Sequence, residues 1–258
     1  MLLRAIALSL TLAASTLADT IRVGAAISLK DAFDAIAKKY EAETGEHVEF
    51  SFGSSGQVMA QIKSGAGIDV FVSAATQQVE QLTKEKLVDA STSRVVAGNQ
   101  LVLIVPADAK TPPKDFAELA ASSVEKIAAG EPKTVPAGQY AKQVFQSLKI
   151  ESAVANKIVY GTNVRQVLAY VERGEVQAGL VYATDARQSG EKVKIVATAA
   201  AGTHEPIVYP GVVIANTTHA PAALKFLDYL ATPAAKAELT AKGFSVDDLA
   251  PAKQPAVQ

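Results

Sequence analysis

Four short segments bring small, hydroxyl-bearing or amide residues to predicted junctions between a strand and a helix. They are residues 26–31 (AISLKD), 53–56 (GSSG), 135–138 (VPAG) and 161–164 (GTNV). At the start of a helix the backbone N–H groups have no intrahelical partner and carry partial positive charge, so they attract anions. Serine hydroxyls add further donors without adding net charge. Together the four segments could surround a small anion with hydrogen-bond donors alone.

The same residues could instead serve only the helices that they begin. Ser28, with Asp31 three residues later, fits a capping box, and Pro136 suits the first turn of a helix. Thr162 or Asn163 can cap the helix that follows them. Most serines at helix starts are ordinary caps and bind nothing. Four such junctions in one chain nevertheless favour a binding site.

Catalytic motifs do not assemble from the sequence. Residues 53–56 are not a G-x-S-x-G nucleophile elbow, and neither a Walker A sequence nor G-x-G-x-x-G is present. His47, His204 and His219 are isolated and lack the spacing of metal ligands. We therefore expect a binding protein rather than an enzyme. A Ser–His–Asp triad assembled across the fold stays open, which keeps a periplasmic serine hydrolase as an alternative.

Tyrosines suggest a weaker alternative. Tyr160, Tyr182 and Tyr209 could ligate iron, but no adjacent tyrosine pair supports such a site. Each is interpreted as a core or edge aromatic, and an iron or organic-acid binder ranks below an oxyanion binder.

The junctions lie in a regular alternation of strands and helices. Strands are predicted at residues 20–25, 47–52, 69–73, 100–106, 127–129, 158–160, 178–182, 193–197 and 207–214. Helices are predicted from Leu29, over residues 56–64, 77–84, 139–148 and 164–173, and from Ala220 and Pro233. This alternation is typical of an α/β protein with mainly parallel sheets, whose ligands bind at the carboxyl ends of strands.

Two long apolar strands, residues 100–106 and 207–214, predict a division into two lobes. The chain would cross to the second lobe at the first strand and return at the second. We expect lobe I to comprise residues 19–100 and 211–258, and lobe II residues 101–210. Each lobe would hold a mainly parallel sheet flanked by helices, with the two crossover strands as the hinge.

The first eighteen residues predict export. Arg4 precedes an apolar run at residues 5–12, and Thr16 and Ala18 supply the small residues of a signal peptide cleaved after Ala18. The apolar run is too short to span a bilayer. The sequence has no cysteine, which excludes disulfides, thiolate metal sites and a lipid-modified N-terminus. We therefore expect a soluble periplasmic protein.

The charge balance limits the partners. The formal net charge is −1, so no basic field marks the chain as a binder of nucleic acid. An anion site must consequently be built from local groups. We expect a monomer without a cofactor.

The ordered series of motifs resembles the periplasmic molybdate-binding proteins of ABC importers. The similarity runs from about Ile21 to Phe244, and each motif is unspecific by itself whereas the series is specific. The motifs are residues 25–29 (AAISL), 52–56 (FGSSG), 67–74 (GIDVFVSA), 135–141 (VPAGQYA), 164–165 (VR) and 181–186 (VYATDA).

The resemblance implies a type II periplasmic-binding-protein fold with a molybdate or tungstate oxyanion in the cleft. The implied contacts are the Ser28 hydroxyl and amide, the Ser55 hydroxyl, the Ala137 and Val164 amides and the Tyr182 hydroxyl. Ser54 is the alternative to Ser55, because only two serines stand where three small hydroxyl residues are common. The metal is held only as the oxyanion, without direct metal ligands. An ABC permease with its cytoplasmic ATPase is the implied partner.

The chemistry of the anions agrees with a pocket made of donors. Molybdate and tungstate are bare dianions at neutral pH, whereas phosphate keeps a proton and needs an acceptor. Asp31 is the one candidate carboxylate, and a capping role accounts for it more simply. Sulfate is also a bare dianion, so a sulfate-type binder of the same fold remains the main alternative.

Overall fold

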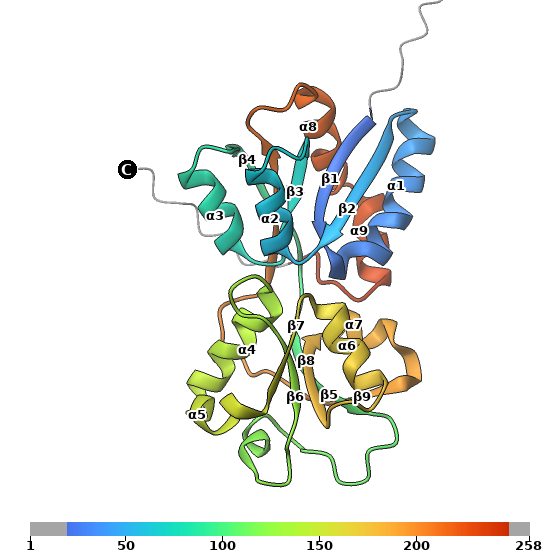
Figure 1. Ribbon diagram of the computed structural model, residues 1–258. Helices are drawn as coiled ribbons and strands as arrows, with labels where there is room; N and C mark the ends of the chain where they lie inside the picture. The colour runs from blue at the N-terminus through green and yellow to red at the C-terminus, as the bar shows by residue number, and fades with distance from the viewer. Residues whose placement is uncertain (1–19, 248–258) are drawn as a thin grey trace, which may run out of the picture.

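The computed structural model describes residues 20–247, in which ten strands form two five-stranded sheets. Each sheet with its flanking helices makes one lobe, and the lobes stack end to end (Figure 1). We call the lobe that contains the start of the described chain lobe I and the other lobe II. No helix among these residues is long and apolar enough to cross a membrane.

The sheet of lobe I has the strand order β2-β1-β3-β10-β4. Its strands are β1 (Thr20–Ala26), β2 (His47–Gly53), β3 (Val70–Val72), β4 (Val88–Gly98) and β10 (Val208–Ile214). The first three are parallel, and β10 runs antiparallel between β3 and β4. The helices of this lobe are η1 (Ile27–Leu29), α1 (Lys30–Thr44), α2 (Ser55–Lys63), α3 (Thr76–Lys84), α8 (Ala220–Tyr229) and α9 (Pro233–Ala241).

The sheet of lobe II repeats this plan with the order β7-β6-β8-β5-β9. Its strands are β5 (Leu101–Pro106), β6 (Ile127–Gly130), β7 (Ile158–Gly161), β8 (Ala178–Tyr182) and β9 (Val193–Thr198). Strands β6, β7 and β8 are parallel, and β5 is antiparallel to β8 and β9. The main helices are α4 (Pro136–Ser147), α5 (Glu151–Val154), α6 (Val164–Glu172) and α7 (Ala183–Gln188). Single turns lie at η2 (Ala117–Ala120), η3 (Ala155–Lys157) and η4 (Gly190–Lys192).

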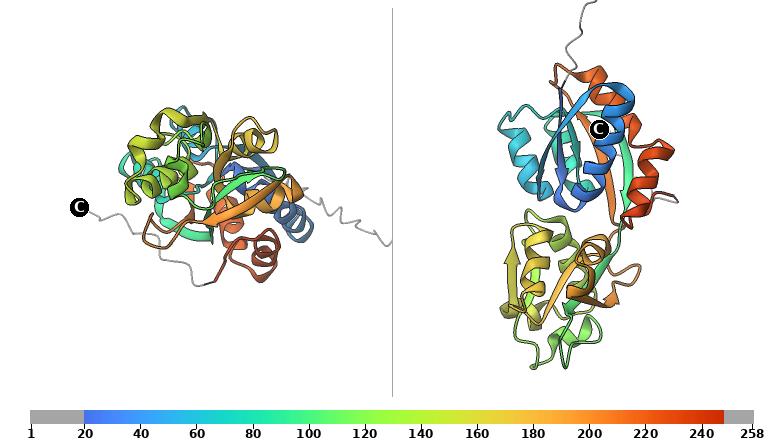
Figure 2. Two further views of the ribbon diagram at one scale, coloured as in Figure 1. Left: turned by 90° about the horizontal axis from the view of Figure 1, so that it is seen from below. Right: turned by 90° about the vertical axis from the view of Figure 1, so that its right-hand side faces the viewer.

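Two connections join the lobes, as the sequence predicts. The chain leaves lobe I between β4 and β5 and returns between β9 and β10. The connections lie together, because the Asn99 N–H donates to the Ile207 carbonyl over 3.1 Å. Figure 2 shows that the lobes meet end to end while these segments run between them. The predicted lobe boundaries at 100/101 and 210/211 stay a prediction, and the second falls within β10.

Both faces of the lobe I sheet are covered by helices that the hydrophobic pattern indicates. The predicted inner face of the first helix is buried throughout, at Leu29 of η1 and at Phe33, Ile36, Ala37 and Tyr40 of α1. Phe33 and Tyr40 both meet the ring of Phe226 in α8 edge to face, at centroid distances of 6.5 and 5.2 Å. Helices α2 and α3 bury Val58 and Leu82 in a separate cluster on the other face. The apolar faces of these helices thus pack on the sheet and fix the ends of β1 and β2, where the junctions begin.

Several elements differ from the sequence prediction, and the short helices α5 and α7 have no predicted counterpart. Strand β4 has no predicted counterpart, because its first half, residues 89–93 (DASTS), is polar and largely exposed. Pairing with β10 rather than an alternating pattern makes it a strand. Helix α4 begins at Pro136 instead of residue 139, since proline is favoured in the first turn and Val135 precedes it in an extended conformation.

Candidate anion-binding site between the lobes

Ser28 follows β1 and is buried in the single turn η1. Its Oγ lies 3.0 Å from the phenolic oxygen of Tyr209 in β10. The predicted capping box of Ser28 and Asp31 is wrong, because neither η1 nor α1 has a side-chain cap. The inserted turn moves the start of α1 to Lys30, so Ser28 no longer stands immediately before the helix. Its hydroxyl is consequently available for other contacts.

The two serines at the start of α2 have different partners. The Ser54 side chain accepts the N–H of Gln57 over 3.3 Å, and the Gln57 side chain accepts the N–H of Ser54 over 3.0 Å. This is a reciprocal capping box, so Ser54 serves the helix. Ser55 is fully buried, and its Oγ accepts the Ala74 N–H over 2.9 Å. The hydroxyl proton of Ser55 can still be donated.

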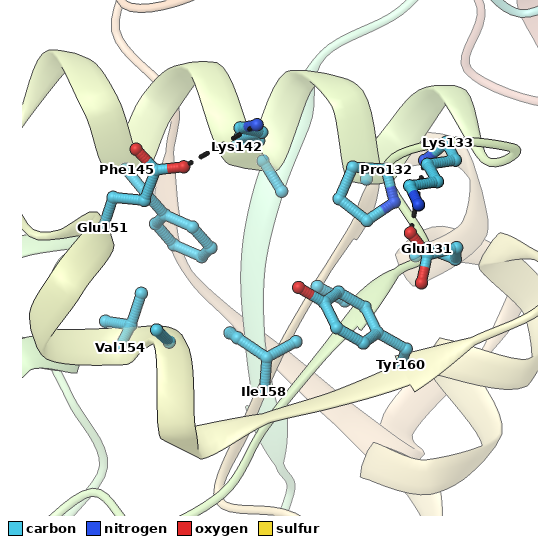
Figure 3. A pocket seen from close by; sticks show the side chains of 14 residues that line it. Glu131, Pro132, Lys133, Lys142, Phe145, Glu151, Val154, Ile158 and Tyr160 are labelled. Carbon is cyan, nitrogen blue, oxygen red and sulfur yellow. Dashed lines mark hydrogen bonds and ion pairs between the residues drawn. The ribbon is translucent and has the colours of Figure 1, made fainter.

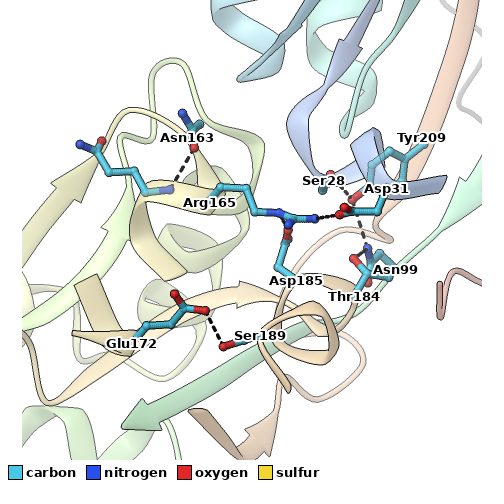
Figure 4. Close-up of polar contacts among 11 residues, drawn as sticks. Ser28, Asp31, Asn99, Asn163, Arg165, Glu172, Thr184, Asp185, Ser189 and Tyr209 are labelled. Atoms are coloured by element: carbon cyan, nitrogen blue, oxygen red, sulfur yellow. Dashed lines mark hydrogen bonds and ion pairs between the residues drawn. The ribbon is translucent and has the colours of Figure 1, made fainter. Parts of the chain in front are cut away.

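Ala137 and Val164 lie in the first turns of α4 and α6. Backbone N–H groups in the first turn have no carbonyl partner within their own helix. Asn163 caps α6 by accepting the N–H of Gln166 over 3.0 Å, which confirms one of the two predicted caps (Figure 4). Ala137 and Val164 are both buried, at 1% and 3% exposure.

Tyr182 ends β8 with its side chain buried at 1% exposure. Its hydroxyl has no hydrogen-bond partner among residues 20–247. Burial raises the pKa of Tyr182 well above its ordinary value, so the hydroxyl keeps its proton. The hydroxyl can therefore donate a hydrogen bond to an acceptor placed beside it. Its ring centroid lies 5.9 Å from that of Tyr209, which in turn contacts Ser28. Sequence reasoning from the junctions missed Tyr182, because it ends an apolar strand.

Direct contacts between the lobes bring the junctions at residues 53–56 and 135–138 together. The Gly56 N–H in α2 donates to the Thr134 carbonyl over 2.9 Å, which sets Ser55 beside the start of α4. The Tyr140 hydroxyl of α4 lies 3.4 Å from the carbonyl of Ala74, whose N–H binds Ser55. The lobes therefore meet directly at these two junctions.

Arg165, next to Val164, makes the third contact between the lobes. Its Nη2 lies 2.6 Å from Asp31 of α1, and its Nε lies 2.5 Å from Asp185 of α7 (Figure 4). Asp31 therefore forms an ion pair and does not cap its helix, contrary to the sequence interpretation. No local pattern could reveal this contact, because 134 residues separate its partners.

Asp185 is a buried carboxylate that the sequence analysis did not single out. Its side chain is fully buried, and Oδ2 has no hydrogen-bond partner among residues 20–247. Burial raises the pKa of Asp185 to about 6, although the Arg165 guanidinium acts in the opposite direction. Asp31, Asp185 and Arg165 thus form a cluster in which two carboxylates share one guanidinium.

A separate cavity of about 270 Å³ lies in lobe II, between α4, α5 and β7 (Figure 3). Phe145, Val154 and Ile158 form its apolar wall, and Lys142 lies 3.9 Å from Glu151 at its rim. None of the residues predicted to contact the anion lines this cavity. Its apolar wall and solvent-exposed charges do not suit a dehydrated oxyanion.

The histidines do not form a metal centre. No group of three or more histidine, cysteine or acidic residues in the described chain could hold a metal ion. His47 pairs with Glu41 at 2.6 Å and His219 with Asp69 at 3.2 Å, both in lobe I. His204 packs edge to face on Tyr140, with centroids 5.7 Å apart. The donors between the lobes therefore remain the candidate site.

Comparisons with known proteins show the family of the chain. The bacterial extracellular solute-binding protein family matches residues 21–245. The chain is 38% identical over 229 residues to the molybdate-binding protein ModA of Haemophilus influenzae, covering 87% of this chain and 89% of that protein. It is 36% identical over 249 residues to ModA of Escherichia coli, covering 93% and 95%.

A solved structure supports the same relationship. The periplasmic molybdate-binding protein of Azotobacter vinelandii superimposes with a TM-score of 0.79 at 26% identity, covering 88% of this chain and 100% of that one. The two-lobed type II periplasmic-binding-protein fold implied by the motifs is thereby confirmed. The chain belongs to the bacterial extracellular solute-binding proteins and, within them, to the group of the molybdate-binding proteins.

Proposed function

We propose that this protein captures molybdate or tungstate in the cleft between its lobes and delivers the anion to an ABC importer. The observation that carries the proposal is the Tyr182 hydroxyl, a protonated and buried donor without a partner among residues 20–247. A buried donor left unpaired costs about 1–3 kcal/mol, and an anion in the cleft would remove that cost. The proximity of Tyr182 to Tyr209 and Ser28 supports a common site.

The proposed contacts to the anion are hydrogen bonds alone. The Ser28, Ser55 and Tyr182 hydroxyls, the Ser28 amide and the first-turn amides of Ala137 and Val164 would donate them. Ser54 is assigned to the helix cap instead, on the strength of its bonds with Gln57. A site of this kind suits a bare tetrahedral dianion.

The charges around the cleft support the same ligand class. Arg165 engages the carboxylates of Asp31 and Asp185, which reduces the negative charge that the bound oxyanion would meet there. The amides at the two helix starts add partial positive charge. The protein needs no bulk positive charge to attract its cargo into a dry, donor-lined cleft.

Closure of the lobes is the proposed signal to the importer. The Gly56–Thr134 bond and the Arg165–Asp31 ion pair form only when the lobes meet. Closure completes the donor shell and excludes water, which strengthens each hydrogen bond to the anion. The closed protein would dock as a monomer on a permease in the inner membrane, whose ATPase lies in the cytoplasm.

We further propose that the protein acts in the periplasm as a carrier and not as an enzyme. Molybdate or tungstate is its cargo rather than a cofactor. The signal peptide predicted over residues 1–18, with cleavage after Ala18, lies outside the described residues. The division into lobes at residues 100/101 and 210/211 is part of the same proposal.

A pair of neighbouring serines tests the site. Ser55→Ala should weaken molybdate binding by roughly 1–3 kcal/mol in calorimetric titration, because the anion loses a donor in a dry site. Ser54→Ala should instead lower the free energy of unfolding by about 1 kcal/mol through loss of the cap, with a smaller effect on affinity. Loss of affinity in Ser54→Ala together with unchanged affinity in Ser55→Ala would overturn the assignment.

A further inference from the structure

We propose that Asn99 and Tyr209 form a hydrogen-bond relay that fixes the Ser28 hydroxyl as a donor toward the anion and so selects proton-free oxyanions. The inference rests on the proposed function, because it assigns positioning residues to the same site. Neither Asn99 nor Tyr209 is among the residues proposed to touch the anion. Both lie where the chain passes between the lobes, Asn99 just after β4 and Tyr209 in β10.

The direction of the relay begins at the Asn99 amide. Its Oδ1 accepts the N–H of Gln100 over 2.9 Å, which places the NH₂ group on the opposite side. Nδ2 then lies 2.9 Å from the Thr184 hydroxyl and 3.2 Å from the Tyr209 hydroxyl (Figure 4). An amide nitrogen only donates, so Tyr209 receives a hydrogen bond from Asn99.

The second step runs from Tyr209 to Ser28. The Tyr209 oxygen lies 3.0 Å from Ser28 Oγ, and both side chains are buried. Since Tyr209 already accepts from Asn99, its own proton is best directed at Ser28. Burial raises the pKa of Tyr209 well above its ordinary value, so that proton stays in place. Ser28 Oγ thereby accepts one bond, and its own proton is left for the anion.

The relay should discriminate between oxyanions that carry a proton and oxyanions that do not. A serine that already accepts from Tyr209 offers its O–H outward, which suits an anion that only accepts. Hydrogen phosphate must place its own proton against an acceptor, and a Ser28 fixed as a donor does not supply one. A buried polar group that meets a ligand of the wrong donor pattern discriminates strongly, because one of the two groups stays unpaired. Asn99 and Tyr209 would therefore act on selectivity without touching the ligand.

A double-mutant cycle tests the relay. Molybdate affinity is measured by calorimetry for the full-length mature protein and for Tyr209→Phe, Ser28→Ala and the double variant. Tyr209→Phe should weaken binding about fivefold to tenfold, but change affinity less than about twofold when Ser28 is already alanine. Tyr209→Phe should also lower the ratio of molybdate to phosphate affinity. Tyr229→Phe is the matched control, because its hydroxyl contacts Glu43 in lobe I, and it should leave both affinities unchanged.

The outcomes separate the relay from the proposed function. Failure of the unmodified protein to bind molybdate would refute the proposed function itself. The relay alone would be overturned if the protein binds molybdate but Tyr209→Phe lowers the affinity equally in the unmodified protein and in Ser28→Ala. It would also be overturned if Tyr209→Phe does not lower the affinity at all. If Tyr209→Phe fails to fold, Asn99→Ala can replace it in the double-mutant cycle with Ser28→Ala, because it leaves the buried Tyr209 ring in place. Its loss of affinity, about twofold to fivefold, should likewise disappear in the Ser28→Ala background.

Discussion

Arg165 and Asp31 form an ion pair between the two lobes, with Nη2 of Arg165 2.6 Å from Oδ2 of Asp31. Asp31 lies in the first turn of α1 in lobe I, and Arg165 lies in the first turn of α6 in lobe II. The two side chains are 27% and 26% exposed, so water screens their attraction less than that of a surface pair. The pair therefore stabilises the closed arrangement that surrounds the anion.

Removing the charge of Asp31 should loosen the closed state. We expect Asp31→Asn to weaken molybdate binding roughly tenfold, mainly through faster dissociation, because charge-assisted bonds are the stronger ones. Dissociation can be followed by displacement with excess tungstate. The matched control is Asp34→Asn, which breaks an exposed pair with Lys30 on the same helix and should change the rate less than twofold. Equal effects of the two variants would contradict a role for the Arg165 pair in closure.

Gly56 should be required because the opposite lobe approaches its backbone. A Cβ atom at this position would lie 2.5 Å from the Thr134 carbonyl oxygen, a backbone atom that cannot turn away. Gly56→Ala should therefore hinder closure and weaken molybdate binding roughly tenfold to hundredfold. Small-angle scattering with molybdate should show a larger radius of gyration than that of the unmodified protein.

Gly53 supplies the control for the same loop. A Cβ atom there would meet nothing nearer than 3.4 Å, at the Gln57 side chain. Gly53→Ala should accordingly bind molybdate within about twofold of the unmodified protein. Normal affinity and compaction in Gly56→Ala would show that the Gly56–Thr134 approach is not part of the bound state.

Tyr182 should trade stability against binding. Tyr182→Phe removes the unpaired buried hydroxyl, so the unliganded protein should gain about 1 kcal/mol of unfolding free energy while molybdate affinity falls. The loss of affinity should be smaller than in Ser28→Ala or Ser55→Ala, because the ring stays in place. Denaturant unfolding and calorimetry measure the two effects. Tyr40→Phe is the control. The Tyr40 hydroxyl donates to Glu46, so its removal should lower the unfolding free energy without changing molybdate affinity. A Tyr182→Phe protein that is less stable and binds unchanged would refute the assignment.

Asp185 should give the unliganded protein a defined pH dependence. Burial raises its pKa to about 6 in the folded protein, above an unfolded value near 3.9. Its contribution to stability is therefore fully present below the unfolded pKa and is lost as the pH rises through 6. Asp185→Asn keeps an oxygen acceptor for Arg165 but cannot titrate. The unfolding free energy of the unmodified protein minus that of the variant should fall by about 2 kcal/mol between pH 4 and pH 7. A constant difference would place the folded pKa of Asp185 near its ordinary value.

The sequence predicts the parts of this fold that depend on local pattern. The apolar spacing of α1 identifies its buried face, and the apolar run of β5 identifies a strand buried on both sides. The small residues at four strand ends indicate where a ligand would bind. These features are local, because a helix or strand repeats its contacts every few residues.

Contacts between residues far apart in the sequence were beyond local reasoning. The pattern Ser28-x-x-Asp31 fits a capping box, but only the three-dimensional arrangement shows Ser28 against Tyr209 and Asp31 against Arg165. Tyr182 ends an apolar strand like a core aromatic, and only its family motif indicated a contact. Its lack of a partner among the described residues is a property of the packed lobes.

The most direct test of the account is calorimetric titration of the purified protein with molybdate, tungstate, sulfate and phosphate in turn. The account predicts tight binding of one molybdate or one tungstate per chain, with sulfate and phosphate much weaker. Tighter binding of sulfate would keep the donor-lined cleft but contradict the assigned cargo. Absence of binding to all four anions would contradict the central claim that the cleft between the lobes holds a tetrahedral oxyanion.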